Sequence, residues 1–255
     1  MHNILSLFFT LGIGLFILLG SIIVLLIKNN DNFVRFSISV AFGVMTSLIV
    51  LELLPESLEL INSDYSFPIN IILIILFILI GVFTLKILDY FIPDHEVHDH
   101  TNKAIKHNLY HIGLISSIAL ILHNIIEGMA VYSTLTSSLS LGVLVSIGVG
   151  LHNIPMGMVI TSTFYKANNN IRKTMFIIFV ISISTFMGGL IMYFNSNLLI
   201  NDFILGMLLC ITLGMLSYIV LFELLPHIIN SKNKKYELSG IFIGILIMLI
   251  SVFIG

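Results

Sequence analysis

Residues 43–55 read GVMTSLIVLELLP, and residues 214–226 read GMLSYIVLFELLP. The glycine, the glutamate, both leucines and the proline coincide at one constant offset. Each copy lies in a long apolar run and ends at a proline, which cannot donate a backbone hydrogen bond within a helix. Two such copies predict an internally repeated helical structure. The alternative is a chance similarity between two apolar helices.

The composition around these copies is that of a membrane protein. Of the 255 residues, 58% are hydrophobic and 9% charged, and the mean hydropathy is +1.11. A soluble domain of this length needs far more charge to cover its surface. Apolar runs that can each cross roughly 30 Å of hydrocarbon recur along the whole chain. We therefore predict an all-α integral membrane protein in which residues 1–255 form a single polytopic domain.

The apolar runs predict eight transmembrane helices. The first lacks a basic start and a cleavage site, so it is expected to be a spanning helix and not a signal peptide. The single cysteine, Cys210, lies in an apolar run and cannot form a disulfide within the chain. The predicted spans are 3–27, 36–58, 69–92, 112–135, 139–164, 173–195, 202–228 and 237–255.

The basic residues gather in or beside alternate loops and set the predicted orientation. The positive-inside rule assigns these loops to the cytoplasm and both termini to the outside. The outer loops carry Glu59, Asp64 and Asp202 instead. With this orientation the repeats are inverted, helices 1–3 against 6–8 and helix 4 against helix 5. The eleven basic residues are Lys28, Arg35, Lys86, Lys103, Lys106, Lys166, Arg172, Lys173, Lys232, Lys234 and Lys235.

Two His-Asn pairs lie near the middle of predicted helices four and five. His123 precedes Glu127 by four residues, which puts both side chains on one face of a helix. His152 occupies the corresponding depth in the next helix, and the two segments share the pattern H-N-x-x-x-G-M. Imidazoles and a carboxylate that meet at mid-membrane are typical ligands of a borderline divalent metal such as zinc, iron or manganese. The alternative is a buried polar network that ties helices together.

Three further side chains flank these ligands. Asn124 and Asn153 follow the two histidines, and Met156 shares a helix face with His152. Pro155 leaves a backbone carbonyl without its usual donor, and irregular backbone at this depth is tolerated where it lines a cavity. A packing kink at Pro155 is the alternative.

Glu52 and Glu223 are the glutamates of the repeated segments. The inversion puts Glu52 toward the outer face and Glu223 toward the inner face, which makes them candidate relay or gate ligands on either side of the central site. The alternative is a carboxylate that reaches out to interfacial water. Glu56 and His227 follow the two prolines and are expected near opposite mouths.

A histidine-rich cytoplasmic loop is predicted at about residues 93–111. It contains His95, His98 and His100 among three carboxylates, and His107 and His111 follow. This density favours weak, flexible metal binding, and an ordinary solvated loop is the alternative.

These features together resemble the ZIP (Zrt/Irt-like protein) family of divalent-metal transporters. The resemblance rests on eight helices, outward termini, the histidine-bearing loop, and the motifs H-N-x-x-E-G and H-N-I-P-x-G. It implies a metal site between helices four and five, influx toward the cytoplasm, often a homodimer and an elevator-like motion. By position it implies that His123, Glu127 and His152 bind the metal, with Asn124 and Asn153 at a second, adjacent site.

The chain departs from the family pattern at two positions of the second metal site and at one position of the inner exit. Many members have a carboxylate or histidine where this chain has Met156, and many bacterial members have a glutamate where Thr185 stands. The inner exit likewise has Phe222-Glu223 in place of a His-Glu pair. We therefore predict one strong metal site, which leaves a bound divalent ion at a charge of about +1. A thioether beside it tilts selectivity toward zinc, cadmium or iron over manganese.

The leading hypothesis is a divalent-metal transporter, with zinc as its first substrate, in a bacterial plasma membrane. An intramembrane zinc hydrolase is the first alternative, although Glu127 would then have to serve as ligand and base at once. A metal sensor without transport is the second. We expect no organic cofactor, and no nucleic-acid-binding motif is present. The expected partners are the metal ion, the lipid bilayer and a second copy of the chain.

Overall fold

A computed structural model describes residues 2–27, 31–62, 67–91, 102–195, 202–230 and 234–254. Within these ranges the chain is helical apart from short turns and helix ends. The helices are α1 His2–Leu26, α2 Asp31–Leu48, η1 Ile49–Leu53, α3 Leu54–Asn62, α4 Ile69–Phe91, α5 Asn102–Ser137, α6 Leu139–Asn168, α7 Ile171–Phe194, α8 Asp202–Tyr218, η2 Ile219–Leu224, α9 Leu225–Ile229 and α10 Lys234–Ile254.

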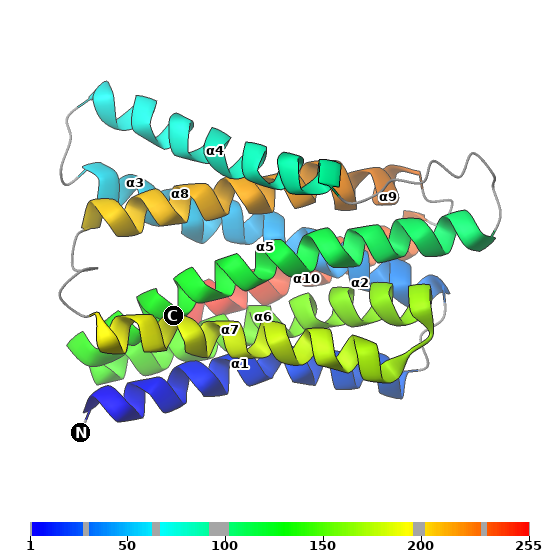
Figure 1. The fold of residues 1–255 in the computed structure, drawn as a ribbon, viewed down its shortest axis with the longest axis horizontal. Helices are drawn as coiled ribbons and strands as arrows, with labels where there is room; N and C mark the ends of the chain where they lie inside the picture. Colours follow the sequence, from blue (N-terminus) through cyan, green and yellow to red (C-terminus); the bar gives the residue numbers. More distant parts are fainter. Residues whose placement is uncertain are drawn as a thin grey trace.

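Eight of the described helical segments are long and apolar enough to span a membrane, as predicted for an all-α integral membrane protein. They run back and forth along the long axis, and both termini lie toward the same end (Figure 1). The two largest differences from the predicted boundaries are helix starts. α2 begins at Asp31, whose carboxylate favours a helix N-terminus. α5 begins at Asn102 and not at residue 112, because Ile105, Leu109 and Ile112 continue the helical apolar spacing.

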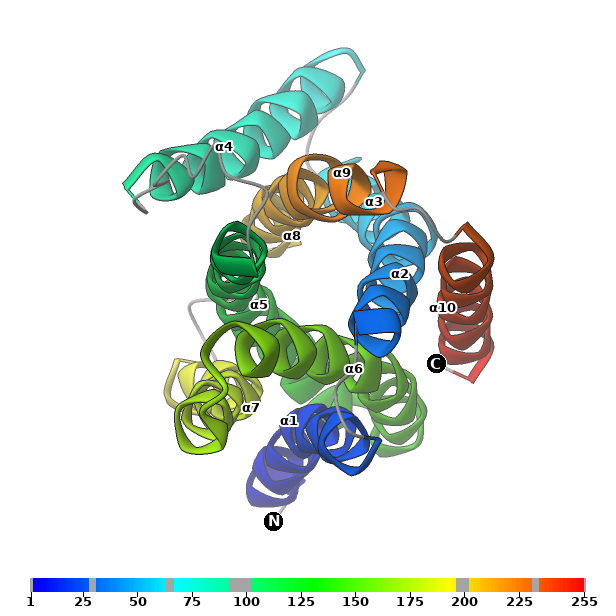
Figure 2. The same cartoon turned by 90° about the vertical axis from the view of Figure 1, so that its right-hand side faces the viewer.

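The helices form two bundles that lie side by side (Figure 2). The first bundle consists of α1, α5, α6 and α7, and the second of α2, η1, α3, α4, α8, η2, α9 and α10. α6 is among the most buried helices, whereas α4 packs mainly on α8 and leaves most of its apolar surface exposed. An exposed apolar surface on a spanning helix is suited to lipid.

Helix pairs in one half of the repeat pack in the same way as the corresponding pairs in the other half. α1 packs on α6 as α7 packs on α5, and α2 packs on α10 as α8 packs on α4. Glycines make these contacts close: a Cβ at Gly157 would overlap the carbonyl oxygen of Ile17 in α1, and one at Gly188 would overlap that of Ile125 in α5. Small residues let membrane helices approach to backbone contact. Each bundle is therefore held internally by backbone-to-backbone packing.

The repeated E-L-L-P segments form two π-helical turns. In η1 the backbone N–H of Leu54 donates to the carbonyl of Ile49, and in η2 that of Leu225 donates to Val220, five residues back in each case. The next residue, Pro55 or Pro226, has no N–H, and its ring would clash with the carbonyl four residues earlier in a regular α-helix. The wider turn relieves this clash. It also presents Glu52 and Glu223 from irregular turns of a type that is frequent at functional sites.

Candidate metal site

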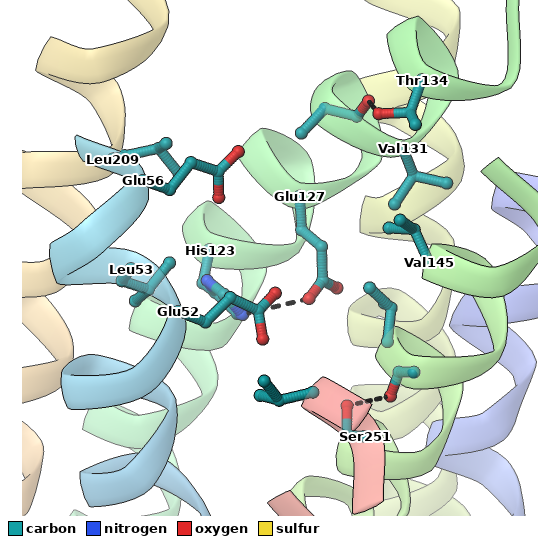
Figure 3. Close-up of a pocket in the computed structure, with 14 residues that line it drawn as sticks. Glu52, Leu53, Glu56, His123, Glu127, Val131, Thr134, Val145, Leu209 and Ser251 are labelled. Carbon is teal, nitrogen blue, oxygen red and sulfur yellow. Dashed lines mark hydrogen bonds and ion pairs between the residues drawn. The ribbon is translucent and has the colours of Figure 1, made fainter. Parts of the chain in front are cut away.

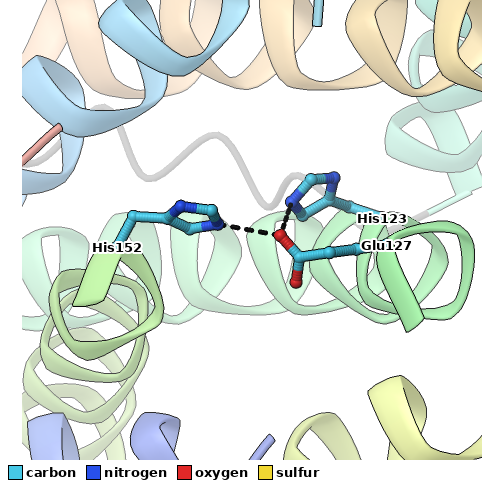
Figure 4. A group of neighbouring side chains, drawn as sticks. All are labelled: His123, Glu127 and His152. Atoms are coloured by element: carbon cyan, nitrogen blue, oxygen red, sulfur yellow. Dashed lines mark hydrogen bonds and ion pairs between the residues drawn. The ribbon is translucent and has the colours of Figure 1, made fainter. Parts of the chain in front are cut away.

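Three buried side chains converge between α5 and α6 (Figure 4). His152 Nε2 lies 2.8 Å from Glu127 Oε1, and His123 Nε2 lies 3.5 Å from the same oxygen. His123, Glu127 and His152 are 2%, 8% and 0% exposed. One ligand atom from each lies within 4.8 Å of the other two. Because zinc bonds of about 2 Å put tetrahedral ligand atoms roughly 3.3 Å apart, a small adjustment would let these atoms surround one ion.

The helices account for this convergence. His123 and Glu127 are four residues apart on α5 and face the same side. α6 continues through Pro155 as one helix, so His152 lies on regular helix and not on the irregular backbone considered above. Gly148, one turn before His152, accepts a 2.7 Å hydrogen bond from the Ser251 hydroxyl of α10 through its carbonyl oxygen.

Ser251 also orients the imidazole of His152. Its hydroxyl oxygen lies 3.5 Å from His152 Nδ1. Since the hydroxyl proton goes to Gly148, the oxygen can accept a hydrogen bond from Nδ1–H. With a metal bound, Nε2 would then offer its lone pair to the ion in place of its 2.8 Å contact with Glu127 Oε1. This tautomer is the one that a metal at Nε2 requires.

A cavity of about 250 Å³ adjoins the site. α5 and α6 form one wall and η1, α3, α8 and α10 form the other, so the cavity lies between the two bundles. It extends from His123 past Val131 to Thr134, toward the end of the bundle where α5 ends. Glu52 and Glu56 point into it from the second bundle (Figure 3).

The remaining residues predicted beside the site are all buried, in different surroundings. Asn124 Nδ2 donates to the carbonyl of Ile181 in α7 at 3.3 Å. Asn153 is fully buried, and among the described residues neither of its amide atoms has a hydrogen-bond partner. Met156 is 1% exposed and belongs to the main hydrophobic core. Thr185 is fully buried. Metal ligation by Asn124, Asn153 and Met156 stays a prediction.

A second polar cluster lies near the other end of α5. His111 Nε2 is 2.9 Å from Asp89 Oδ1 of α4, and His111 Nδ1 is 3.5 Å from Glu223 Oε2 of η2. Tyr218 donates a 2.6 Å hydrogen bond to Asp89 Oδ2. The cluster borders a cavity of about 620 Å³ that also contains Arg35 and His227. His111 and His123 are twelve residues apart on α5, or about 18 Å along the helix axis.

From the sequence, Glu223 is predicted as a pathway residue and His111 as part of the preceding loop, but the two are not brought together and Asp89 is not singled out. Asp89 carried a usable signal, since a carboxylate inside an apolar run is costly and commonly functional. His111 was attributed to the preceding loop because the start of α5 was predicted too late. Asp89, His111 and Glu223 lie together because α4 and α5 pack against η2. That packing cannot be predicted from residues that are close together in the sequence. The predicted loop ligands His95, His98 and His100 lie outside the described residues.

Comparison with known proteins places the chain among metal transporters. The sequence profile described as ZIP Zinc transporter matches residues 92–251. Three similar relatives each carry the name Zinc transporter ZupT. The protein from Chlorobium chlorochromatii is 29% identical over 95% of this chain and 94% of its own length. Those from Chlorobium phaeovibrioides and Streptococcus mutans are 31% and 29% identical, over 96% and 91% of this chain and 96% and 90% of their own lengths.

Proposed function

Because this chain belongs to the ZIP family of zinc transporters, we propose that it carries divalent metal ions, with zinc as the first substrate, into the cytoplasm. The observation that best supports this proposal is that the buried side chains of His123, Glu127 and His152 lie close together beside a cavity. Neutral imidazoles and one carboxylate suit zinc, and their depth in the bundle suits a transport site. The relatives are named as transporters and not as enzymes, so the intramembrane hydrolase is not supported.

The path that we propose has three stations. A cation enters the cavity lined by Glu52 and Glu56, binds at the central site, and leaves by the Asp89, His111 and Glu223 cluster. The basic residues of the alternate loops support this direction, since the positive-inside rule puts the Arg35 and His227 end in the cytoplasm. We further propose that the chain resides in a bacterial plasma membrane with both termini outside, and that it forms a homodimer.

Neutralising the inner cluster should slow transport without weakening the central site. In Asp89→Asn and Glu223→Gln variants the cation loses charged acceptors some 18 Å beyond His123. We expect the maximal rate of zinc uptake to fall at least severalfold while equilibrium zinc affinity is unchanged. Uptake into proteoliposomes and zinc titration of the purified protein measure these two quantities. Loss of affinity in parallel with rate would contradict a separate exit station.

Competition between metals tests the predicted selectivity. Imidazole ligands, with a thioether nearby, favour zinc and cadmium over manganese. Unlabelled zinc should therefore suppress radioactive zinc uptake at far lower concentration than manganese does. Met156→Leu keeps the side-chain volume and removes the sulfur, so cadmium should compete less well, relative to zinc, than in the wild-type protein. Manganese that competes better than zinc in the wild-type protein would refute the selectivity, and unchanged competition by cadmium in the variant would refute a role for the sulfur.

A further inference from the structure

The cavity beside the central site has acidic residues on the wall opposite the three ligands. His123 and Glu127 line the wall formed by the first bundle, whereas Glu52 of η1 and Glu56 of α3 line the wall formed by the second. Figure 3 shows the Glu52 carboxylate directed toward the same part of the cavity as His123 and Glu127.

Two of the three ligands have buried polar atoms without hydrogen-bond partners. Within the described part of the chain, Glu127 Oε2 and both ring nitrogens of His123 have no hydrogen-bond partner, although Nε2 lies 3.5 Å from Glu127 Oε1. Both side chains are more than nine-tenths buried. Buried polar atoms without partners are costly, so they indicate a ligand that satisfies them.

Coordination number and charge both call for one more anionic ligand. Zinc held by protein is usually four-coordinate, and the convergence supplies three donors. With Glu127 as the one carboxylate a bound divalent ion retains a charge of about +1, which is unfavourable in a buried site. A second carboxylate would complete the tetrahedron and neutralise the ion.

We propose that Glu52 is the fourth protein ligand of the transported cation, so that the bound ion ties the first bundle to the second through the cavity. This inference rests on the proposed function. The π-helical turn at η1, which directly precedes Leu54 and Pro55, presents the carboxylate. It also revises the expectation of a singly charged site, which counted only ligands from α5 and α6.

The competing role for Glu52 is that of a passing station, a carboxylate that attracts the cation without holding it at the central site. Glu56 provides the matched comparison, because it lines the same cavity one turn further along. Glutamine in place of either residue removes one negative charge at nearly constant size. A ligand and a passing charge therefore predict different results for Glu52→Gln relative to Glu56→Gln.

The test uses the full-length protein purified in detergent, with zinc titrated for affinity and cobalt(II) as a spectroscopic probe. Glu52→Gln should weaken zinc binding by more than tenfold, at least matching the ~10–100-fold loss on removing a group behind a metal ligand. It should also change the intensity of the visible cobalt bands at saturation, because the coordination sphere changes. Glu56→Gln should leave both affinity and spectrum as in the wild type.

Wild-type affinity and spectrum in Glu52→Gln, with slowed uptake, would overturn the inference and make Glu52 a passing station. Equal losses in the two glutamine variants would overturn it as well, since charge alone would then explain them. If Glu52→Gln is not monodisperse, Glu52→Asp replaces it, and a ligand predicts weakened affinity because its reach is shorter. His123→Ala is run in parallel: retained zinc binding and uptake in that variant would instead refute the proposed function.

Discussion

Zinc uptake into proteoliposomes should fall to the level of protein-free vesicles when His123 or His152 is replaced by alanine. Each substitution removes one of three converging donors from a site in which the remaining polar atoms are buried. Because loss of a group behind a metal ligand already costs ~10–100-fold, loss of a ligand should cost at least ~100-fold. Zinc affinity, measured by titration, should fall with uptake.

Deletion of residues 95–100 is the comparison that separates the central site from the histidine-rich loop. The deletion removes His95, His98 and His100 but none of the converging ligands, so uptake should persist. Uptake that survives both alanine substitutions would rule out a transport site at this position. A wild-type protein that binds zinc but transports none would instead favour a metal sensor.

Gly157→Ala should disrupt the first bundle. A Cβ at residue 157 of α6 would overlap the carbonyl oxygen of Ile17 in α1. A Cβ at Gly20 of α1 would in turn overlap the carbonyl oxygen of Ile154 in α6. α1 and α6 must then separate, because neither contact ends on a flexible side chain. Overpacking typically costs ~1–3 kcal/mol, and displacement of backbone against backbone should reach the upper part of that range. Thermal unfolding followed by gel filtration measures the effect.

Gly12→Ala is the matched control on the same helix pair. A Cβ at Gly12 of α1 meets no atom within 4 Å, so the substitution should leave assembly intact and favour the helix by up to ~1 kcal/mol. Zinc titration of Gly157→Ala should also show weakened binding, since His152 lies on the displaced helix. Equal thermal stability of the two alanine variants would refute close α1–α6 packing as the basis of the bundle.

Much of the architecture follows from patterns that are local in the sequence. Eight apolar runs predicted eight spans, and the described part of the chain contains eight helical segments that are long and apolar enough to cross a membrane. The repeated E-L-L-P segments predicted related halves, and the exchanged packing partners agree with them. Helix ends were less predictable. α5 begins at Asn102, ahead of its predicted start, because the polar, histidine-bearing stretch resembles a loop in composition although its apolar spacing is helical.

The π-helical turns show where local reasoning was incomplete. The sequence shows that Pro55 and Pro226 each lack a backbone donor. Whether the turn before each proline stays α-helical or widens into a π-turn depends also on how neighbouring helices pack against it. That choice sets the direction of the Glu52 and Glu223 side chains. It therefore decides which cavity each carboxylate enters.

The sequence by itself determined the membrane class, the number of spans, the repeat and the position of His123 and Glu127 on one helix face, because hydropathy and i, i+4 spacing act within one helix. Only the tertiary structure decided that Asp89 and His111 join Glu223, that Ser251 orients His152, and that Glu52 faces the central ligands across a cavity. Each of these contacts joins helices that are distant in the chain. Their relative rotation and depth depend on how the two bundles pack against each other, which no single segment contains.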